Sequence, residues 1–358
     1  MNTKIVTFLF SFISISYSSF GQKHRTDLEK MNLRGKVKSI HDTVQFPLED
    51  SVEKVIDIHG SDIDDELYNF NETGNITVHI IKSKHLSITD LYLYNKAGNL
   101  ISKLEYRCRD SSKRADRYGE TQPNLKDTVK TFYTYNEKGK ISEALEYKNS
   151  KKLIRIKDTS RTIYTYDGKG NLLSELVYGN KYKPIDSTIY KYNRKGQLVY
   201  KLHPYFMAGF VSKWRYEYDS IARTICEKAY NEKDTFLGKT TSTCDSLGNI
   251  IESEELDWQG NYKKWNYEYD ARDSVLKMCM YSKNKLLLAN LYQYDTFGNE
   301  IEFTQISDLA TEIHKSQYLF DIHNNWIERK NYYSDFEPHG SIPNQNRLIE
   351  YRKIEYYK

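Results

Sequence analysis

The sequence lacks the short motifs that mark the common classes of enzyme active site. It contains no HExxH zinc motif, no G-x-S-x-G nucleophile turn, no P-loop and no G-x-G-x-x-G dinucleotide-binding turn. Its nine histidines are scattered and form no pair at i, i+4, so their spacing predicts no metal site. We therefore predict no catalytic residue, no cofactor and no bound metal, and we expect a protein that is not an enzyme.

Apolar residues are also scarce. They make up 39% of the chain, below the usual share of about 45–50%. This shortage argues against a thick two-layer core and favours thin sheets with one face in water. After residue 21 no window is apolar enough to cross a membrane. The 53 basic and 49 acidic residues are interleaved along the chain, so no basic stripe indicates nucleic-acid binding.

The longest apolar run lies at the N-terminus. Residues 1–21 combine Lys4, the apolar stretch from Ile5 to Ile15 and small residues before Gln22, a pattern typical of a cleaved secretory signal. An uncleaved anchor is the alternative, but the run is shorter than the span of about 20 residues that a membrane helix needs. No cysteine lies near the cleavage site, so no lipoprotein anchor is expected. The sequence thus predicts an exported protein of the periplasm, the cell surface or the medium.

Tyrosine, in contrast, is abundant, with 32 copies in 358 residues. The stretch Tyr164–Tyr178 shows how it is used. Tyr164 and Tyr166 alternate with Thr165, so both rings fall on one face of a strand. Residues 167–170, Asp-Gly-Lys-Gly, then carry the side chains that favour a tight turn. The stretch predicts a β-hairpin with a loop of about four residues.

This hairpin unit recurs about ten times, which is a strong repeat signal. Aligned on the turn glycine or its replacement, the copies are spaced by 24, 41, 31, 26, 26, 26, 25, 25 and 26 residues. A bulky side chain recurs eight residues after the turn position, and simple alternation places it on the same face as the tyrosines before the turn. One face is therefore predicted to be aromatic and the other largely polar. The turn positions are Gly74, Gly98, Gly139, Gly170, Gly196, Ala222, Gly248, Asp273, Gly298 and Asn324.

The predicted fold class is all-β. Isolated two-stranded hairpins are marginally stable, so successive hairpins should pair edge to edge in one antiparallel meander of about twenty strands. Such a sheet twists, and we expect a spiralling open sheet or a partial barrel. We divide the chain into a signal peptide at 1–21, an arm with the first strands at 22–66, the hairpin repeats at 67–332, and a loop with a closing strand at 333–358.

The repeat pattern Tyr-x-Tyr-Asp/Asn-x-x-Gly-Asn-Leu resembles the YD repeats of bacterial RHS (rearrangement hot spot) proteins. Residues 166–172 (YDGKGNL) and 294–299 (YDTFGN) match it best, and the resemblance covers roughly 67–332. It implies export and a spiralling β-sheet ribbon that can enclose another domain, and carbohydrate binding has been attributed to such repeats. The Asp-Pro-x-Gly core motif of the large members is absent. The family's repeat residues are structural, so the resemblance implies no catalytic residue.

Tryptophans are the candidate binding residues. Trp214 and Trp265 each lie eight residues before a turn position, and alternation places Trp258 on the same, tyrosine-bearing face. If that face is an open groove, the three indoles would form a platform on which sugar rings stack. If the face is filled, they are core residues. The sequence leaves both interpretations open.

Four cysteines occur in this chain, which we expect to be exported. Cys226 and Cys244 lie on strands that the meander places side by side, symmetric about residue 235 in the connecting turn. In that register they would face each other on the tyrosine face, within reach of a disulfide bond. The alternative is that both are small core residues, with Cys244 in a tyrosine position.

The leading functional hypothesis is a non-enzymatic binding module at the cell envelope, whose partner is a carbohydrate or an envelope protein. A structural scaffold or shell element, related to RHS toxin-delivery proteins, is the second hypothesis. A glycan hydrolase is the third, because such enzymes need a pair of carboxylates and these are abundant. Most aspartates, however, fall in turns and most glutamates on the polar strand face. No nucleic-acid partner is expected.

Overall fold

The computed structural model describes residues 26–45, 63–83, 86–109, 125–150, 156–179, 184–205, 210–337 and 340–358. The predicted signal peptide lies outside these ranges. The described residues form one short helix, α1 (Asp27–Lys30), and 22 strands. The strands are β1 (Val37–Gln45), β2 (Ile63–Phe70), β3 (Ile76–Ser83), β4 (Leu86–Tyr94), β5 (Leu100–Arg109), β6 (Leu125–Tyr135), β7 (Ile141–Ser150), β8 (Ile156–Tyr166), β9 (Leu172–Tyr178), β10 (Pro184–Tyr192), β11 (Leu198–Tyr205), β12 (Phe210–Asp219), β13 (Thr224–Tyr230), β14 (Phe236–Cys244), β15 (Ile250–Asp257), β16 (Tyr262–Tyr269), β17 (Val275–Ser282), β18 (Lys285–Tyr294), β19 (Glu300–Ser307), β20 (Thr311–Phe320), β21 (Trp326–Glu337) and β22 (Gly340–Tyr356).

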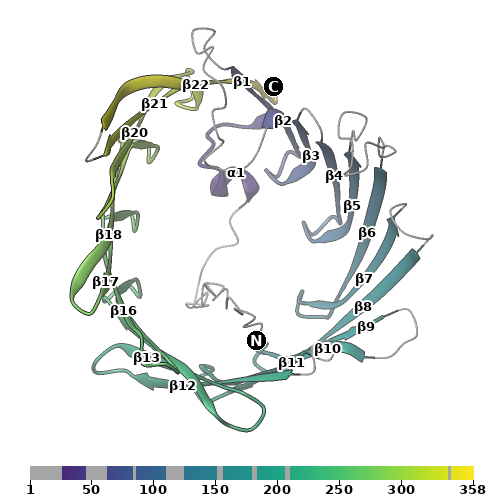
Figure 1. Ribbon diagram of the computed structural model, residues 1–358. Helices are drawn as coiled ribbons and strands as arrows, with labels where there is room; N and C mark the ends of the chain where they lie inside the picture. The colour runs from purple at the N-terminus through teal and green to yellow at the C-terminus, as the bar shows by residue number, and fades with distance from the viewer. Residues whose placement is uncertain are drawn as a thin grey trace, which may run out of the picture.

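These strands form one closed antiparallel barrel (Figure 1). Each strand pairs with the next in sequence, and β22 pairs back onto β1. Ile40 of β1 accordingly faces Tyr68 of β2 on one side and Ile354 of β22 on the other. The predicted all-β antiparallel meander is confirmed. The sheet is closed rather than open, because pairing β1 with β22 removes the unpaired edges that an open sheet would expose.

The turn chemistry inferred from the sequence is present in the hairpins. The N–H of Gly170 donates to the carbonyl oxygen of Asp167 at 3.0 Å. The Asp167 side chain accepts from the backbone N–H groups of Lys169 and Asn171. Hydrogen bonds from Asn171 lower the pKa of Asp167. In ten other turns the side chain of the first residue likewise accepts from the backbone N–H groups two and four residues later. These residues are Asn71, Asn95, Asn136, Asn193, Asn231, Asp245, Asp257, Asp270, Asp295 and Asp321.

A β-bulge after the turn reverses the side-chain alternation. In the β8–β9 hairpin Tyr166 pairs with Leu172 but Thr165 pairs with Ser174, so Leu173 is an extra residue in the return strand. Corresponding shifts occur in most of the repeat hairpins. A slip of one residue moves every later side chain to the other face. The prediction that the bulky column after the turn shares the face of the tyrosine pairs is therefore wrong. That column, which includes Tyr106, Tyr147, Tyr178, Tyr230, Leu256, Tyr281, Ile306 and Tyr332, lies on the opposite face.

The face that carries the tyrosine pairs is the inner wall of the barrel. Figure 1 shows α1 inside the ring of strands. Leu28 of α1 packs against the cluster of Val37, Ile40 and Phe70, which share a face with Tyr68. Because directly paired residues share a face, the strand pairings show that the tyrosine pairs of the other hairpins lie on this same face. The tyrosine pairs of successive hairpins therefore point into the lumen, and the residues between them point outward.

In most of the tyrosine pairs, the second tyrosine connects neighbouring hairpins. The hydroxyl of Tyr166 donates to the carbonyl oxygen of Ile141, in the preceding hairpin, at 2.8 Å. The acceptor is the residue two positions after the turn position of that hairpin. Equivalent bonds are made by Tyr94, Tyr135, Tyr218, Tyr269 and Tyr294. The inner tyrosines are thus both an aromatic lining and a set of connectors.

Within the described residues, the barrel is hollow. A ring of 22 strands is too wide for its own side chains to fill the interior. Among the described residues, the buried apolar cluster of Val37, Ile40 and Phe70 lies where α1 covers the wall. Most of the inner wall is therefore reachable from the lumen.

The outer face carries many charged residues, which pair between neighbouring strands. Lys228 lies 2.7 Å from Glu217, and Lys277 lies 2.9 Å from Glu268. Outer aromatic rings pack on one another, as Tyr147 does against Phe132 with ring centres 6.1 Å apart. Among the described residues, no helix is long and apolar enough to span a membrane.

The loop predicted at the start of 333–358 is not a loop. β21 continues to Glu337, and β22 begins at Gly340. The polar composition of residues 333–346 is misleading because their backbone pairs with the neighbouring strand, with two register shifts along the way. The closing strand itself is confirmed, and it is longer than expected.

Candidate binding site in the barrel lumen

Neighbouring strands place two carboxylates in one row of the inner wall. Glu227 of β13 pairs with Thr240 of β14, which pairs in turn with Glu255 of β15. Tyr216 of β12 lies opposite Glu227 at one end of the row, and Lys263 of β16 lies opposite Glu255 at the other. Residues that pair directly share a face of the sheet, so these five side chains all belong to the lumen.

Small residues lie on both sides of this row. Ala229 pairs with Gly238 on one side, and Ser242 pairs with Ser253 on the other. A Cβ atom at Gly238 would lie 3.1 Å from the backbone oxygen of Leu256, so the glycine allows two strands to approach closely. The result is a small, shallow hollow over β14, with room for about one water molecule, lined by Glu227, Ala229, Gly238, Thr240 and Glu255 among others.

Two of the three candidate tryptophans lie on the inner face near this hollow, but neither lines it. Trp214 pairs with Ala229, and Trp265 pairs with Ser253 on one side and Met280 on the other. Both are half-buried. The Nζ atom of Lys201 lies 5.0 Å from the centre of the Trp214 ring. In the described part of the chain, no cation or second ring stacks on Trp265.

Burial shifts the protonation of both carboxyl groups in the same direction. Desolvation raises the pKa of Glu227, although the Tyr216 hydroxyl and the charge of Lys201 oppose this. Burial likewise raises the pKa of Glu255 against the opposing charge of Lys263. A carboxyl group with a raised pKa holds a proton more readily, and in that form it can donate as well as accept a hydrogen bond.

The third candidate tryptophan lies elsewhere. Trp258 belongs to the turn between β15 and β16 and is 66% exposed. The strand ends at Asp257, where the turn to Gly260 begins. Trp258 therefore lies in the turn and on neither face of the sheet. The prediction that this residue lies on the tyrosine face is wrong.

The predicted disulfide between Cys226 and Cys244 is also wrong. Cys226 pairs with Thr241 on the outer face, whereas Cys244 points into the lumen. The register of the β13–β14 hairpin thus places Cys226 three residues away from a pairing with Cys244.

Glu227 and Glu255 are not among the residues singled out from the sequence. Simple alternation places glutamates such as Glu255 on the outer, polar face, because it does not include the bulge after the turn. For Glu227 the cause is the turn between β12 and β13, a hairpin without a bulge. The missed signal is the column five residues after each turn position, which faces the first tyrosine of the hairpin and changes in chemistry along the chain. This column includes His79, Lys103, Glu175, Lys201, Glu227 and Arg329.

A second polar cluster closes the barrel between its first and last strands. Arg352 of β22 donates two hydrogen bonds to Asp42 of β1, at 2.8 and 2.6 Å. Its guanidinium carbon also lies 3.6 Å from the centre of the Trp326 ring. Arg329 pairs with Glu350 beside it. Burial raises the pKa of Asp42, which Arg352 opposes. These side chains are engaged with one another, so we assign the cluster to closure of the barrel rather than to a ligand.

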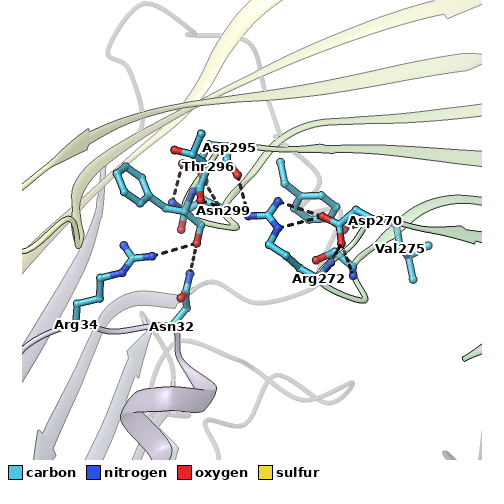
Figure 2. Close-up of polar contacts among 11 residues, drawn as sticks. Asn32, Arg34, Asp270, Arg272, Val275, Asp295, Thr296 and Asn299 are labelled. Carbon is cyan, nitrogen blue, oxygen red and sulfur yellow. Dashed lines mark hydrogen bonds and ion pairs between the residues drawn. The ribbon is translucent and has the colours of Figure 1, made fainter. Parts of the chain in front are cut away.

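The rim of short turns is joined to the segment that contains α1. Asn32 and Arg34 donate to the carbonyl oxygen of Phe297, at 2.8 and 3.3 Å, and Figure 2 shows these two side chains beside the turn of Asp295 and Asn299. In the adjacent turn, Arg272 donates to the carbonyl oxygen of Asp295 at 3.2 Å. This segment therefore crosses the junction of the first and last strands and fastens the turns on its far side. Within the described residues, no group of three or more His, Cys, Asp or Glu side chains is placed to hold a metal ion.

Comparison with known proteins identifies no family. No protein-family model matches the sequence, and no curated protein matches it. Thirty-nine chains of solved structures match. A porin-like protein from Bacteroides uniformis is 12% identical, over 89% of this chain and 98% of its own, with a TM-score of 0.29.

Other matches are structures of TcdB2-TccC3. The one without its hypervariable C-terminal region is 11% identical over 87% of this chain and 21% of its own, with a TM-score of 0.24. A second is 8% identical over 80% of this chain and 26% of its own, with a TM-score of 0.15. TM-scores of this size carry no functional argument, and the candidate site rests on the geometry of the chain itself.

Proposed function

We propose that this protein is a non-enzymatic binding protein that holds a carbohydrate or protein ligand on the inner wall of its barrel. The observation that carries the proposal is a hollow lumen whose wall is lined by aromatic rings and remains accessible. Binding sites for organic ligands are typically concave, aromatic and furnished with a few polar groups, and this wall combines those properties.

The side chains opposite the first tyrosines support a binding role. The tyrosine pairs have a structural task, because their hydroxyls connect successive hairpins. The column that faces them has no such uniform task, and its chemical group varies from hairpin to hairpin, as in His79, Lys103 and Glu175. A ligand that runs along the lumen would meet a series of distinct contacts.

We place this activity at the cell envelope, as the sequence of residues 1–21 predicts. The support is the charged and apolar pattern of that segment. N-terminal sequencing of protein recovered from fractionated cells checks this part. A mature chain that begins at Gln22 in an envelope fraction or in the medium is the expected result.

The location of the ligand can be tested by blocking the lumen. Ligands are first found with a glycan array and with purified envelope proteins. In a background without native cysteines, Glu175→Cys places a thiol on the inner wall and Glu217→Cys places one on the outer face. A bulky polyethylene glycol maleimide should abolish binding when attached at position 175 and leave it unchanged at position 217. Equal effects at both positions, or none at either, would contradict a site in the lumen.

A shell that encloses another polypeptide is the second candidate. The observation that favours it is the closed wall, sealed by the buried pair of Arg352 and Asp42. A photo-reactive group at position 175 would then cross-link to a defined polypeptide, and the same group at position 217 would not. Binding of a free soluble ligand in the blocking experiment favours the first candidate over this one.

A further inference from the structure

The outer wall of the barrel is not uniform, and one sector of it is apolar. Leu91 and Leu93 alternate along β4 with two inner tyrosines, so both leucines point outward. The outward side chains of β5, β6 and β7 beside them are largely apolar as well. We call this surface the outer apolar patch. Its main members are Leu91, Leu93, Tyr106, Phe132, Leu145 and Tyr147.

Most of the patch is exposed to solvent. Leu93 is 57% exposed, and Leu91, Tyr106, Phe132 and Tyr147 are between 37% and 45% exposed. Large apolar side chains that are exposed singly are ordinary in a folded protein. A contiguous group of them on neighbouring strands indicates a surface that another molecule covers.

The few charges in and beside the patch are already held by the chain itself. Lys130 lies within the patch, with its Nζ atom 4.6 Å from the centre of the Phe132 ring. At the edge of the patch, Glu143 accepts two hydrogen bonds from Arg161 of β8, at 2.7 and 3.0 Å. The sector over β12–β17 differs, because its outward side chains form several ion pairs between neighbouring strands.

We infer that two copies of this chain pack together through their outer apolar patches, about a two-fold axis. An apolar surface whose few charges are already matched needs no partner of opposite charge, so it can face an identical surface. Packing the patch on the charged sector of another copy would instead remove ion pairs from water, which is costly. The contact is therefore patch to patch, and it closes at a dimer.

The size of the patch agrees with a dimer contact. Strands lie about 4.8 Å apart and side chains on one face recur about every 6.8 Å along a strand, so three rows of side chains on four strands cover about 400 Å². A stable interface buries about 800 Å² on each partner, with an apolar centre and a polar rim. Beyond Glu143 and Arg161 the outer face is again apolar, where Ile163 of β8 pairs with Leu176 of β9. The patch thus supplies the apolar centre, and its surroundings supply the rim.

Analytical ultracentrifugation of the full chain, over a wide range of protein concentrations, tests the inference. The wild type should sediment as a dimer that dissociates on dilution. Leu93→Lys places one ammonium group from each copy in the contact and should raise the dimer dissociation constant by about tenfold or more. Tyr147→Lys, on the other side of the patch, should act in the same direction. Circular dichroism and thermal unfolding establish that each variant is folded.

Leu319→Lys is the matched control. Leu319 of β20 occupies the same place in its hairpin as Leu93, between two inner aromatic residues, and it is 56% exposed. Its direct partner across the sheet is Glu328, and it lies far from the patch along the sheet. This variant should form dimers with the affinity of the wild type.

The remaining outcomes contradict the inference. A wild type that stays a monomer at every concentration overturns it. So does dimerisation of folded Leu93→Lys and Tyr147→Lys with wild-type affinity, because the contact would then lie elsewhere. Equal weakening in Leu319→Lys, or association into open-ended larger species, also overturns a two-fold contact through the patch. Ligand binding in the lumen is a separate measurement, because the patch lies on the outer wall, and the inference stands apart from the proposed function.

Discussion

Turn glycines show how a single backbone angle constrains one residue and leaves its neighbour free. Gly170 has a φ of +88°, in the left-handed region that side chains with a Cβ atom rarely adopt. Gly168, two residues earlier in the same turn, has no positive φ and has open space around it. The two positions look alike in the sequence, and only the turn geometry distinguishes them.

We predict that Gly170→Ala destabilises the protein and that Gly168→Ala does not. At position 170 the added Cβ atom meets no close neighbour, so the loss of about 1–2 kcal/mol comes from the backbone conformation alone. At position 168 the change should be neutral or stabilising by up to about 1 kcal/mol, since alanine restricts the unfolded chain. Denaturant unfolding of both variants measures the difference. Equal stabilities would show that the left-handed angle is not important for this turn.

At the scale of strands and hairpins, side-chain alternation predicted the correct face of the sheet for residues before each turn and the wrong face for residues after it. Tyr164, Trp214 and Trp265 lie on the inner face as expected, because each belongs to the outgoing strand. Tyr178 and Cys226 lie on the opposite face from the one predicted. For Tyr178 the cause is the single extra residue of the β-bulge, which has no special side chain. The aliphatic residue at the bulge, Leu173 in this hairpin, is its only trace in the sequence. The β12–β13 hairpin that leads to Cys226 has no bulge, and there the turn itself changes the face.

The candidate site was predicted in part for the same reason. The tryptophans could be found because their residue type is rare and they precede the turn. The carboxyl groups could not be found, because Glu227 follows the turn and simple alternation placed it in water. The hollow also depends on three strands in exact pairing, and pairing between hairpins is set by the whole sheet rather than by one hairpin.

The bond between hairpins gives a prediction at this scale. Tyr166→Phe removes the hydroxyl that donates to the carbonyl oxygen of Ile141 and keeps the ring. The expected loss of stability is about 0.5–1.5 kcal/mol, the usual net value of a hydrogen bond in a folded protein. Tyr147→Phe is the control, because that ring lies on the outer face and is 44% exposed, and it should change the stability by less than about 0.5 kcal/mol. Unfolding curves for the two variants that coincide would show that the connection contributes nothing.

At the scale of the whole molecule, closure was beyond the reach of the sequence. Whether a long meander remains a ribbon or meets its own beginning depends on twist summed over every strand pair. The contact that seals it joins residues 310 positions apart, Asp42 and Arg352. Both residues are ordinary members of strands that alternate well, and neither carries a motif.

Removing one partner of this closing pair should destabilise the barrel strongly. The Arg352 side chain is 9% exposed, so Arg352→Ala leaves the Asp42 carboxylate buried without its cation. Loss of one partner of a buried pair reduces stability by about 3–5 kcal/mol. Arg161→Ala is the matched change on the outer face, where the pair with Glu143 is partly in water, and it should reduce stability by about 0–1 kcal/mol.

Unfolding experiments and light scattering check this prediction together. An opened barrel exposes the edges of β1 and β22, so Arg352→Ala should also form larger species that Arg161→Ala does not. Arg352→Lys, which keeps the charge without the two-pronged geometry, should fall between them. If Arg352→Ala remains as stable and as small as Arg161→Ala, the closing pair is not what holds the two ends together.

The pairing of β1 with β22 also determines when the barrel can close during synthesis of the protein. Hairpins can form one after another as the chain emerges, because each needs only its neighbour in sequence. β1 cannot receive its second neighbour until β22, the last strand, has been made. Through almost the whole of translation the first strand is therefore a half-paired edge that another chain could occupy. Among the described residues, the segment around α1 precedes β1 and covers its inner side through Leu28, so it is available from the beginning.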